Sequence, residues 1–315
     1  MRKRGVCAAL ALALCLSGCG VSGDIRAPEQ PLRSLPPLRA AEEPDGAAPL
    51  PVYLDGVLAG RGCEKDGARY VDLRPLCARA GIDADWEGDG DGFTLRLGSL
   101  RVEGKKGRDY LTASGRYLYA PEGWLIRGEA LLLPENAVCK LFSLSARAED
   151  GALLLDAGSL SLLEGGADYY DLNFPMEDLF WLAHIIHSEA GIEPLAGKIA
   201  VGNVVMNRVA DPEFPDTVFG VVYDYEHTIQ FEPVSKGTIH DEPGEEAEIA
   251  ARLVLEGANT AGDCLYFVNP DFGSFWFDNN LTFVKKIGRH NFYLPLNTSD
   301  SGADEHAGTD PAAGA

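Results

Sequence analysis

The sequence is short of basic residues, and this shortage excludes one large class of partner. It has 27 Lys and Arg against 48 Asp and Glu in 315 residues, a formal net charge of −21. A protein that binds nucleic acid neutralises backbone phosphates with Lys and Arg. Nucleic acid is therefore not an expected partner.

Metal-binding patterns are also missing. The seven cysteines form no C-x-x-C pair of the kind that holds zinc. His184, His187 and Glu189 read H-x-x-H-x-E, which is not the H-E-x-x-H pattern of zinc proteases. At about 100° per residue, His184 and Glu189 project about 140° apart on a helix, too far for one ion. We expect no metal and no cofactor.

A long hydrophobic run is absent from the N-terminus. The apolar run that follows the basic start R-K-R ends at Leu16, and it is shorter than the ~20 residues that a bilayer requires. The sequence L-S-G-C follows it. A basic end, a short apolar core and small residues before Cys19 resemble a lipoprotein signal peptide. We expect removal of residues 1–18, lipidation of Cys19 and a mature charge of −24, with the exported protein anchored to the outer face of the cytoplasmic membrane and facing the cell wall.

Four cysteines remain after this processing: Cys63, Cys77, Cys139 and Cys264. A disulfide among the first three is open, either between Cys77 and Cys139 or between Cys63 and one of these two. Their spacing does not decide between these pairings.

Composition divides the mature chain into five segments. Residues 19–49 are rich in Pro, Ala, Arg and Glu, which is typical of a semi-rigid, unstructured spacer. The other segments are a β-rich module over 50–158, a linker over 159–174, a catalytic module over 175–296 and a tail over 297–315 whose composition is typical of disorder.

The β-rich module shows short apolar stretches separated by Gly and Asp turns. The stretch R-Y-V-D-L-R-P-L-C-A-R-A-G has a degenerate echo in E-A-L-L-L-P-E-N-A-V-C-K-L-F, each reading as a strand, a short helix and further strands. We expect two repeats packed as one unit. The first copy resembles the copper amine oxidase N-terminal-like domain, but the module has no histidine, so copper is not implied. It is either a stalk or a module that binds the wall or a partner.

A helix pair in the catalytic module carries the main functional candidate. Pro175 and two acids in the following turn predict a helix start, and Gly191 predicts its end. Pro194 then opens a second helix. Glu189 falls in the last turn of the first helix, about 20° from the apolar position Leu182, and therefore at a corner between two helices.

Partial burial and the negative end of a helix dipole both favour the protonated form of a carboxyl group. Glu189 is therefore a candidate general acid. The alternative is a rim residue neutralised by Lys198 or Arg208.

Several blocks of the C-terminal half resemble the SleB/CwlJ cell wall hydrolase family, in family order. They are S-E-A-G-I-E-P, G-K-I-A-V-G-N-V-V-M-N-R-V, F-P-D-T-V-F-G-V-V, Gln230-Phe231, L-Y-F-V-N-P and I-G-R-H-N-F-Y. The resemblance implies an α+β protein whose catalytic domain has a lysozyme-like fold, related to lytic transglycosylases. It also implies cleavage of the bond between N-acetylmuramic acid and N-acetylglucosamine in peptidoglycan, with Glu189 as the catalytic residue.

Other residues are candidates for contact with the sugar. The resemblance places Gln230 and Phe231 by the cleft and implies that His290 braces it. Glu232, where the family often has a small polar residue, is either a second acid or a surface charge. Asn203 either faces the cleft or braces a loop, and Tyr266 and Trp276 are aromatic enough to line a sugar site.

Three functions remain open at this point. A lytic transglycosylase needs Glu189 alone, whereas a hydrolytic muramidase needs a second carboxylate, for which Glu193 is the nearest candidate. A lipoprotein that binds glycan or a partner enzyme without catalysis is the third. Peptidoglycan glycan strands are the expected partner, and the sequence names no regulatory protein and does not separate spore cortex from vegetative wall.

Overall fold

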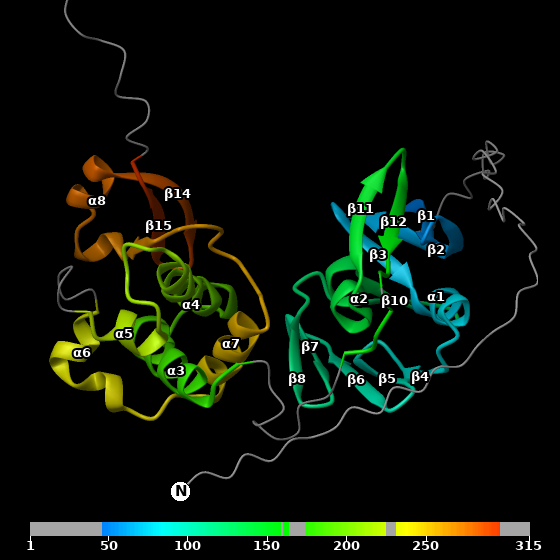
Figure 1. Ribbon diagram of the computed structural model, residues 1–315, viewed down its shortest axis with the longest axis horizontal. Coiled ribbons are helices and arrows are strands. Elements are labelled where there is room, and N and C mark those ends of the chain that lie inside the picture. The colour runs from blue at the N-terminus through cyan, green and yellow to red at the C-terminus, as the bar shows by residue number, and fades with distance from the viewer. Residues whose placement is uncertain (1–45, 159, 164–173, 225–230, 297–315) are drawn as a thin grey trace, which may run out of the picture. The chain divides into compact units, whose positions relative to one another are not determined.

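The structure is a computed structural model that describes residues 46–158, 160–163, 174–224 and 231–296. The chain divides into two units, Met1–Ala40 and Ala41–Ala315, and every described residue belongs to the second. Figure 1 shows strands filling the first part of the described chain, whereas most of the helices follow it. The expected signal peptide, Gln230 and the tail lie outside the described residues.

Residues 48–156 form two sheets and two helices. The seven-stranded sheet has the order β11-β12-β1-β2-β3-β10-β9, in which only β1 and β12 run parallel. The five-stranded sheet, β4-β5-β6-β7-β8, is an antiparallel meander. The strands are β1 (Ala48–Leu54), β2 (Val57–Lys65), β3 (Ala68–Asp72), β4 (Ala84–Gly88), β5 (Gly92–Leu97), β6 (Leu100–Lys105), β7 (Tyr110–Ala113), β8 (Arg116–Tyr119), β9 (Leu125–Arg127), β10 (Ala130–Pro134), β11 (Ser145–Glu149) and β12 (Ala152–Asp156).

The internal echo in the sequence corresponds to a repeated unit of structure. The first copy runs β3, α1 (Leu73–Ala80), β4 and β5, and the second runs β10, α2 (Glu135–Phe142), β11 and β12. The two copies meet where β3 pairs with β10. Alternation within strands supplies the core, as in β5, where Phe93, Leu95 and Leu97 are buried between more exposed neighbours.

The disulfide considered from the sequence is absent. None of Cys63, Cys77, Cys139 and Cys264 forms a disulfide. Cys77 lies on α1 and Cys139 on α2, in different copies of the repeat, while Cys63 belongs to a separate apolar cluster. Burial raises the pKa of Cys77 to about 12 and that of Cys139 to about 11, so both thiols are unreactive packing groups.

Three helices build the core of the second module. The segments α3 (Met176–Ala190), α4 (Leu195–Ala210) and α7 (Glu245–Leu255) pack against one another. Gly202 of α4 permits this packing, because a Cβ there would lie 2.9 Å from side-chain atoms of both Ile186 and Val254. Among the described residues, no helix is both long and apolar enough to cross a bilayer.

Shorter elements surround these helices. The strands β13 (Tyr266–Val268), β15 (His290–Pro295) and β14 (Leu281–Ile287) form an antiparallel sheet in that order. The other helices that the structure describes here are α5 (Val218–Val222), α6 (Glu232–Lys236), α8 (Phe275–Asn280) and the 3-10 turns η2 (Thr238–His240) and η3 (Pro270–Phe272). The two predicted helices around Glu189 are confirmed, each with a slightly later start than predicted.

A buried ion pair joins β8 to the end of α7. Nε and Nη2 of Arg116 each donate to a carboxylate oxygen of Glu256 at 2.6 Å. The two side chains are only 6% and 4% exposed. Lys140 of α2 donates to the Glu256 carbonyl oxygen at 2.8 Å, and Tyr110 of β7 belongs to the apolar cluster of the helices. The strand module and the helical module therefore share buried contacts.

Removal of Arg116 leaves the buried Glu256 carboxylate paired with the partly exposed Lys140, whose Nζ lies 3.3 Å from its Oε2. We expect Arg116→Met to lower the free energy of unfolding by about 3–5 kcal/mol, measured by urea denaturation. The double variant Arg116→Met with Glu256→Leu should recover part of this loss because both charges are gone.

Arg74 and its exposed partner Glu129 provide a matched control. Arg74→Met should change stability by less than about 1 kcal/mol. An Arg116→Met variant as stable as Arg74→Met would show that the buried pair does not hold the two modules together.

Candidate active site

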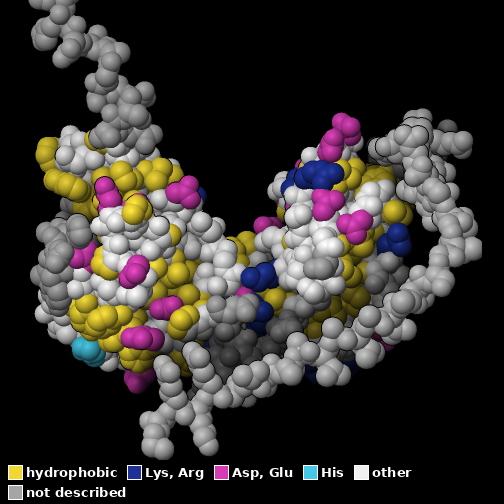
Figure 2. Space-filling model, viewed as in Figure 1, with side chains coloured by type: hydrophobic (Ala, Val, Ile, Leu, Met, Phe, Trp, Pro, Cys, Tyr) yellow, Lys and Arg dark blue, Asp and Glu magenta, His cyan; other side chains and the backbone are white. Residues whose placement is uncertain are grey.

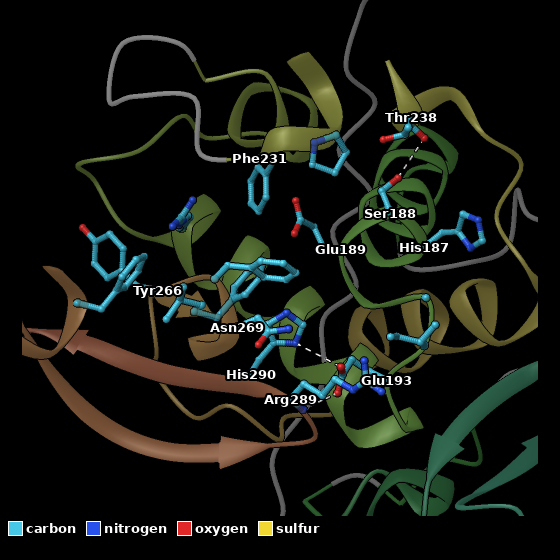
Figure 3. A pocket seen from close by; sticks show the side chains of 18 of the residues that line it. His187, Ser188, Glu189, Glu193, Phe231, Thr238, Tyr266, Asn269, Arg289 and His290 are labelled. Atoms are coloured by element: carbon cyan, nitrogen blue, oxygen red, sulfur yellow. Dashed lines mark hydrogen bonds and ion pairs between the residues drawn. The ribbon is translucent and has the colours of Figure 1, made fainter. Parts of the chain in front are cut away.

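A pocket of about 1070 Å³ lies beside the C-terminal end of α3 (Figure 3). Its walls come from α3, the α3–α4 turn, α4, α6, η2, β13, η3, α8 and the turn between β14 and β15. The acidic residues among its described lining are Glu189, Glu193 and Glu213, and the aromatic ones are Phe214, Phe231, Tyr266, Phe267, Phe272, Trp276 and Phe277. Carboxylates among aromatic rings are a setting suited to carbohydrate chemistry.

Glu189 lies in the last turn of α3, half-buried, as the helix pattern predicts. Figure 3 shows its carboxylate directed into the pocket on the side of Phe231. The two basic residues considered as its neutralising partners make other contacts. Lys198 donates to the carbonyl oxygen of Glu193 and pairs with Glu246, and Nε of Arg208 donates to the Leu265 carbonyl oxygen at 2.8 Å.

The last turn of α3 is held in place from one side. The Ser188 hydroxyl lies 2.9 Å from the carbonyl oxygen of His184 and 3.2 Å from that of Thr238. His184 is itself 2.8 Å from the Ile239 carbonyl oxygen. His187 accepts a hydrogen bond from the Gly244 amide at 3.3 Å. These contacts fix the backbone that carries Glu189.

Glu193 holds the other side of the corner. Its side chain is 2% exposed, and its Oε2 accepts a hydrogen bond from the Arg289 amide at 2.9 Å. This contact ties the α3–α4 turn to the turn between β14 and β15. Gly288 in that turn has φ of +58°, and a Cβ there would lie 1.8 Å from Glu193 Oε2. Only glycine, which has no Cβ, both adopts this positive φ without strain and leaves room for the Glu193 carboxylate.

His290 follows this turn and is 6% exposed. Its Nδ1 lies 3.8 Å from Glu193 Oε1, which is too long for a hydrogen bond, and no described residue supplies a closer partner. Burial lowers the pKa of His290 below its usual value, although Glu193 acts in the opposite direction. The ring is therefore neutral at neutral pH, and it packs edge-on against Phe267 at 5.2 Å.

Arg208 of α4 lies in a cage of aromatic rings. Its guanidinium carbon is 5.1 Å from the ring centre of Phe214, 5.4 Å from Phe231 and 5.3 Å from Tyr266. Burial lowers its pKa to about 10, still well above neutral, so the group stays charged. Cation–π contacts of this kind fix the three rings along one wall of the pocket.

The structure brings most of the predicted site residues together. Glu189, Phe231, Tyr266, Trp276 and His290 all line the pocket. Gln230 and the side chain of Glu232 lie outside what the structure describes.

Asn203 lies away from this pocket, which corrects the prediction that it binds sugar. Its amide donates to the Ala258 carbonyl oxygen at 2.7 Å and accepts from the Thr260 amide at 2.9 Å. Both the nitrogen and the oxygen of the Asn203 side-chain amide thus bond to the loop that follows α7. Asn203 therefore braces that loop, the alternative considered from the sequence.

Comparison with known proteins identifies part of the chain. The family described as Cell Wall Hydrolase matches residues 192–293. This segment is similar to a cell wall hydrolase domain. The match begins just after Glu189, so the role of Glu189 rests on its geometry.

Curated relatives and solved structures match the same region of the chain. The hydrolase domain is similar to the spore cortex-lytic enzyme of Halalkalibacterium halodurans, with 34% identity over 115 residues, 36% of this chain and 34% of that protein. The spore cortex-lytic enzyme of Bacillus subtilis shows 32% identity over 119 residues, 38% of each chain. The solved catalytic domain of the germination-specific lytic transglycosylase SleB from Bacillus anthracis shows 32% identity over 39% of this chain and 98% of that one, with a TM-score of 0.35. The chain spans between 34% and 45% of the length of the curated relatives.

The sequence patterns gave Glu213 no place in the pocket and indicated Arg208 only as a candidate neutralising partner of Glu189. Glu213 lines the pocket from an exposed loop, and nothing in the local sequence distinguishes it from an ordinary surface acid. Arg208 is the last but one residue of the family block G-K-I-A-V-G-N-V-V-M-N-R-V, and the signal available was a basic residue in a largely apolar helix. Among the residues described, no group of three His, Cys, Asp or Glu side chains is placed to hold a metal ion.

The close approach of Gly288 to the Glu193 carboxylate leads to a testable prediction. Gly288→Ala should destabilise the protein by about 1–2 kcal/mol because alanine is strained at this positive φ. It should cost a further ~1–3 kcal/mol because the new methyl group displaces the Glu193 carboxylate. Gly262→Ala is the matched control, with φ of +65° and open space where the Cβ would be. Thermal unfolding and cleavage assays on both variants measure the difference. Equal losses in the two variants would mean that the contact with Glu193 imposes no constraint.

Proposed function

We propose that the chain is a peptidoglycan-cleaving lytic transglycosylase that cuts between N-acetylmuramic acid and N-acetylglucosamine. The observation that supports this most is the place of Glu189, a half-buried carboxylate at a rigid corner directed into a pocket lined by aromatic rings. The hydrolase domain and its similarity to spore cortex-lytic enzymes support the substrate class.

Glu189 performs both proton transfers in this mechanism. As a neutral acid it donates a proton to the glycosidic oxygen while the bond from that oxygen to C1 of the muramoyl residue breaks. The glucosamine residue leaves with a free 4-hydroxyl group. The carboxylate then removes the proton of the muramoyl 6-hydroxyl, whose oxygen attacks C1. The product is a 1,6-anhydro end, Glu189 is protonated again and no water is consumed.

The positions of the other acids favour a single catalytic carboxylate. A two-carboxylate hydrolase needs a second group free to act as nucleophile or to activate water. Glu193 is committed to the Arg289 amide and is almost fully buried. An intramolecular hydroxyl, held at high effective concentration, can outcompete water without such a second acid.

Glu213 supports one competing function. Because it lines the same pocket and is exposed, it is a carboxylate that could serve as the base for water activation in a hydrolytic muramidase. Glu213 thus replaces Glu193 as the residue whose substitution separates the two mechanisms.

The test is cleavage of purified sacculi by three variants. Glu189→Gln keeps the shape but cannot donate or accept the proton, so we expect a fall in activity of about 10² or more with glycan binding retained. Glu193→Gln and Glu213→Gln should lose far less, because a Gln oxygen at 193 still accepts from Arg289. A large loss in Glu213→Gln would favour the muramidase, and undiminished cleavage by Glu189→Gln would move the active site elsewhere.

The proposal also covers the location of the enzyme in the cell and the roles of its other segments. A lipid at Cys19 would anchor the exported chain, and the segment between Cys19 and β1 would lift the folded modules from the membrane toward the wall. The strand module would then act as a stalk or as a weak wall-binding module, resembling the copper amine oxidase N-terminal-like domain. The buried contacts of Arg116 with Glu256 favour a stalk that carries the hydrolase domain in one orientation.

A further inference from the structure

Three aromatic side chains beside the pocket project into solvent. Phe272, Phe275 and Trp276, here called the aromatic shelf, are 89%, 83% and 58% exposed. They come from η3 and α8, and Figure 2 shows hydrophobic side chains gathered over this part of the molecule. Large apolar groups this exposed, side by side, mark an interaction surface.

The shelf rests on a fixed base. The exposed Asp278 carboxylate of α8 accepts from the hydroxyls of Tyr293 and Ser274, both at 2.7 Å. These hydrogen bonds lower the pKa of Asp278. Phe277 packs against the buried ring of Tyr293 at 5.6 Å. The helix is thus held by its inner face, while Phe275 and Trp276 remain exposed.

Hydrogen bonds also tie the polar end of α8 to its own backbone. The side chains of Asn279 and Asn280 donate to the carbonyl oxygens of Phe275 at 2.6 Å and Trp276 at 2.8 Å. A surface fixed in advance loses little conformational freedom when a ligand binds. The exposed rings are therefore arranged for binding before a ligand arrives.

The shelf is continuous with the pocket that contains Glu189. Phe272 and Trp276 line that pocket, whereas Phe275 lies beyond it. We propose that the aromatic shelf binds sugar residues of the glycan strand beyond those at the cleaved bond, so that the enzyme prefers polymeric strands to short fragments. This inference rests on the proposed function and extends it to the length of the substrate.

A glycan strand matches this surface better than a membrane does. The faces of a pyranose ring carry C–H groups that pack on an aromatic ring, and its rim carries hydroxyl groups that suit the neighbouring Ser274 and Asn279. A bilayer on the shelf would also cover the mouth of the pocket, because two shelf residues belong to its wall.

The first experiment compares two substrates. The full chain and the triple variant Phe272→Ala, Phe275→Ala, Trp276→Ala act on intact glycan strands and on a tetrasaccharide of two disaccharide repeats, and kcat/KM is measured for each. We expect the loss on strands to exceed the loss on the tetrasaccharide by about tenfold or more. Equal losses on both substrates, or no loss on strands, would overturn the proposal.

Phe180→Ala is the matched control, because Phe180 is a 49% exposed phenylalanine of α3 that is not part of the pocket. It should leave the ratio between the two substrates as in the wild type. A change in that ratio as large as in the triple variant would show that general loss of surface aromatics, and not the shelf, is responsible.

A binding experiment tests the role of the aromatic shelf independently of the proposed cleavage reaction. In the Glu189→Gln background, co-sedimentation with purified sacculi should weaken about tenfold when the shelf is removed, whether or not the wild-type chain cleaves. Vesicles of phosphatidylglycerol and phosphatidylethanolamine are the parallel probe. Shelf-dependent binding to vesicles, with unchanged binding to sacculi, would overturn the glycan assignment in favour of a membrane.

Discussion

The hydrogen bond from the Arg289 amide to the buried carboxylate of Glu193 is the contact on which the site depends. It joins two parts of the chain far apart in sequence, the corner between α3 and α4 and the turn between β14 and β15. A buried carboxylate is stabilised only where donors or cations meet it. The backbone of Glu193 is held as well, because Lys198 donates to its carbonyl oxygen. Movement of either turn would therefore leave a buried charge without its donor.

Because of this contact, the neighbouring carboxylates of Glu189 and Glu193 have different roles. Glu193 is almost fully buried and holds the walls of the pocket together, whereas Glu189, four residues earlier, is half-buried and reaches into the pocket. Arg208 and its three rings fix another part of the pocket wall, and Phe272 and Trp276 of the aromatic shelf also line the pocket. Rigid supports on several sides favour a reaction that needs one acid in one position and an intramolecular nucleophile.

Local sequence patterns predicted the helical frame correctly but not the contacts that complete the site. Pro175, Gly191 and Pro194 mark the ends of α3 and α4 because they act on the backbone next to them, and the position of Glu189 follows from helical periodicity. The roles of Glu193 and Asn203 depend on partners about 100 and 55 residues away in the chain, respectively. No periodic pattern records such partners. The sequence left a disulfide open for the same reason, since spacing along the chain does not say which cysteines lie close together, and the structure forms none among Cys63, Cys77 and Cys139.

The central claim is that, after cleavage, the oxygen newly bonded to C1 of the muramoyl residue comes from its own 6-hydroxyl group and not from water. Cleavage of purified glycan strands in water enriched in ¹⁸O, followed by mass spectrometry of the new muramoyl ends, tests this claim directly. The account predicts ends that are one water molecule lighter than a reducing end and carry no ¹⁸O. Reducing ends labelled with ¹⁸O as the main product would contradict it and would identify a hydrolase.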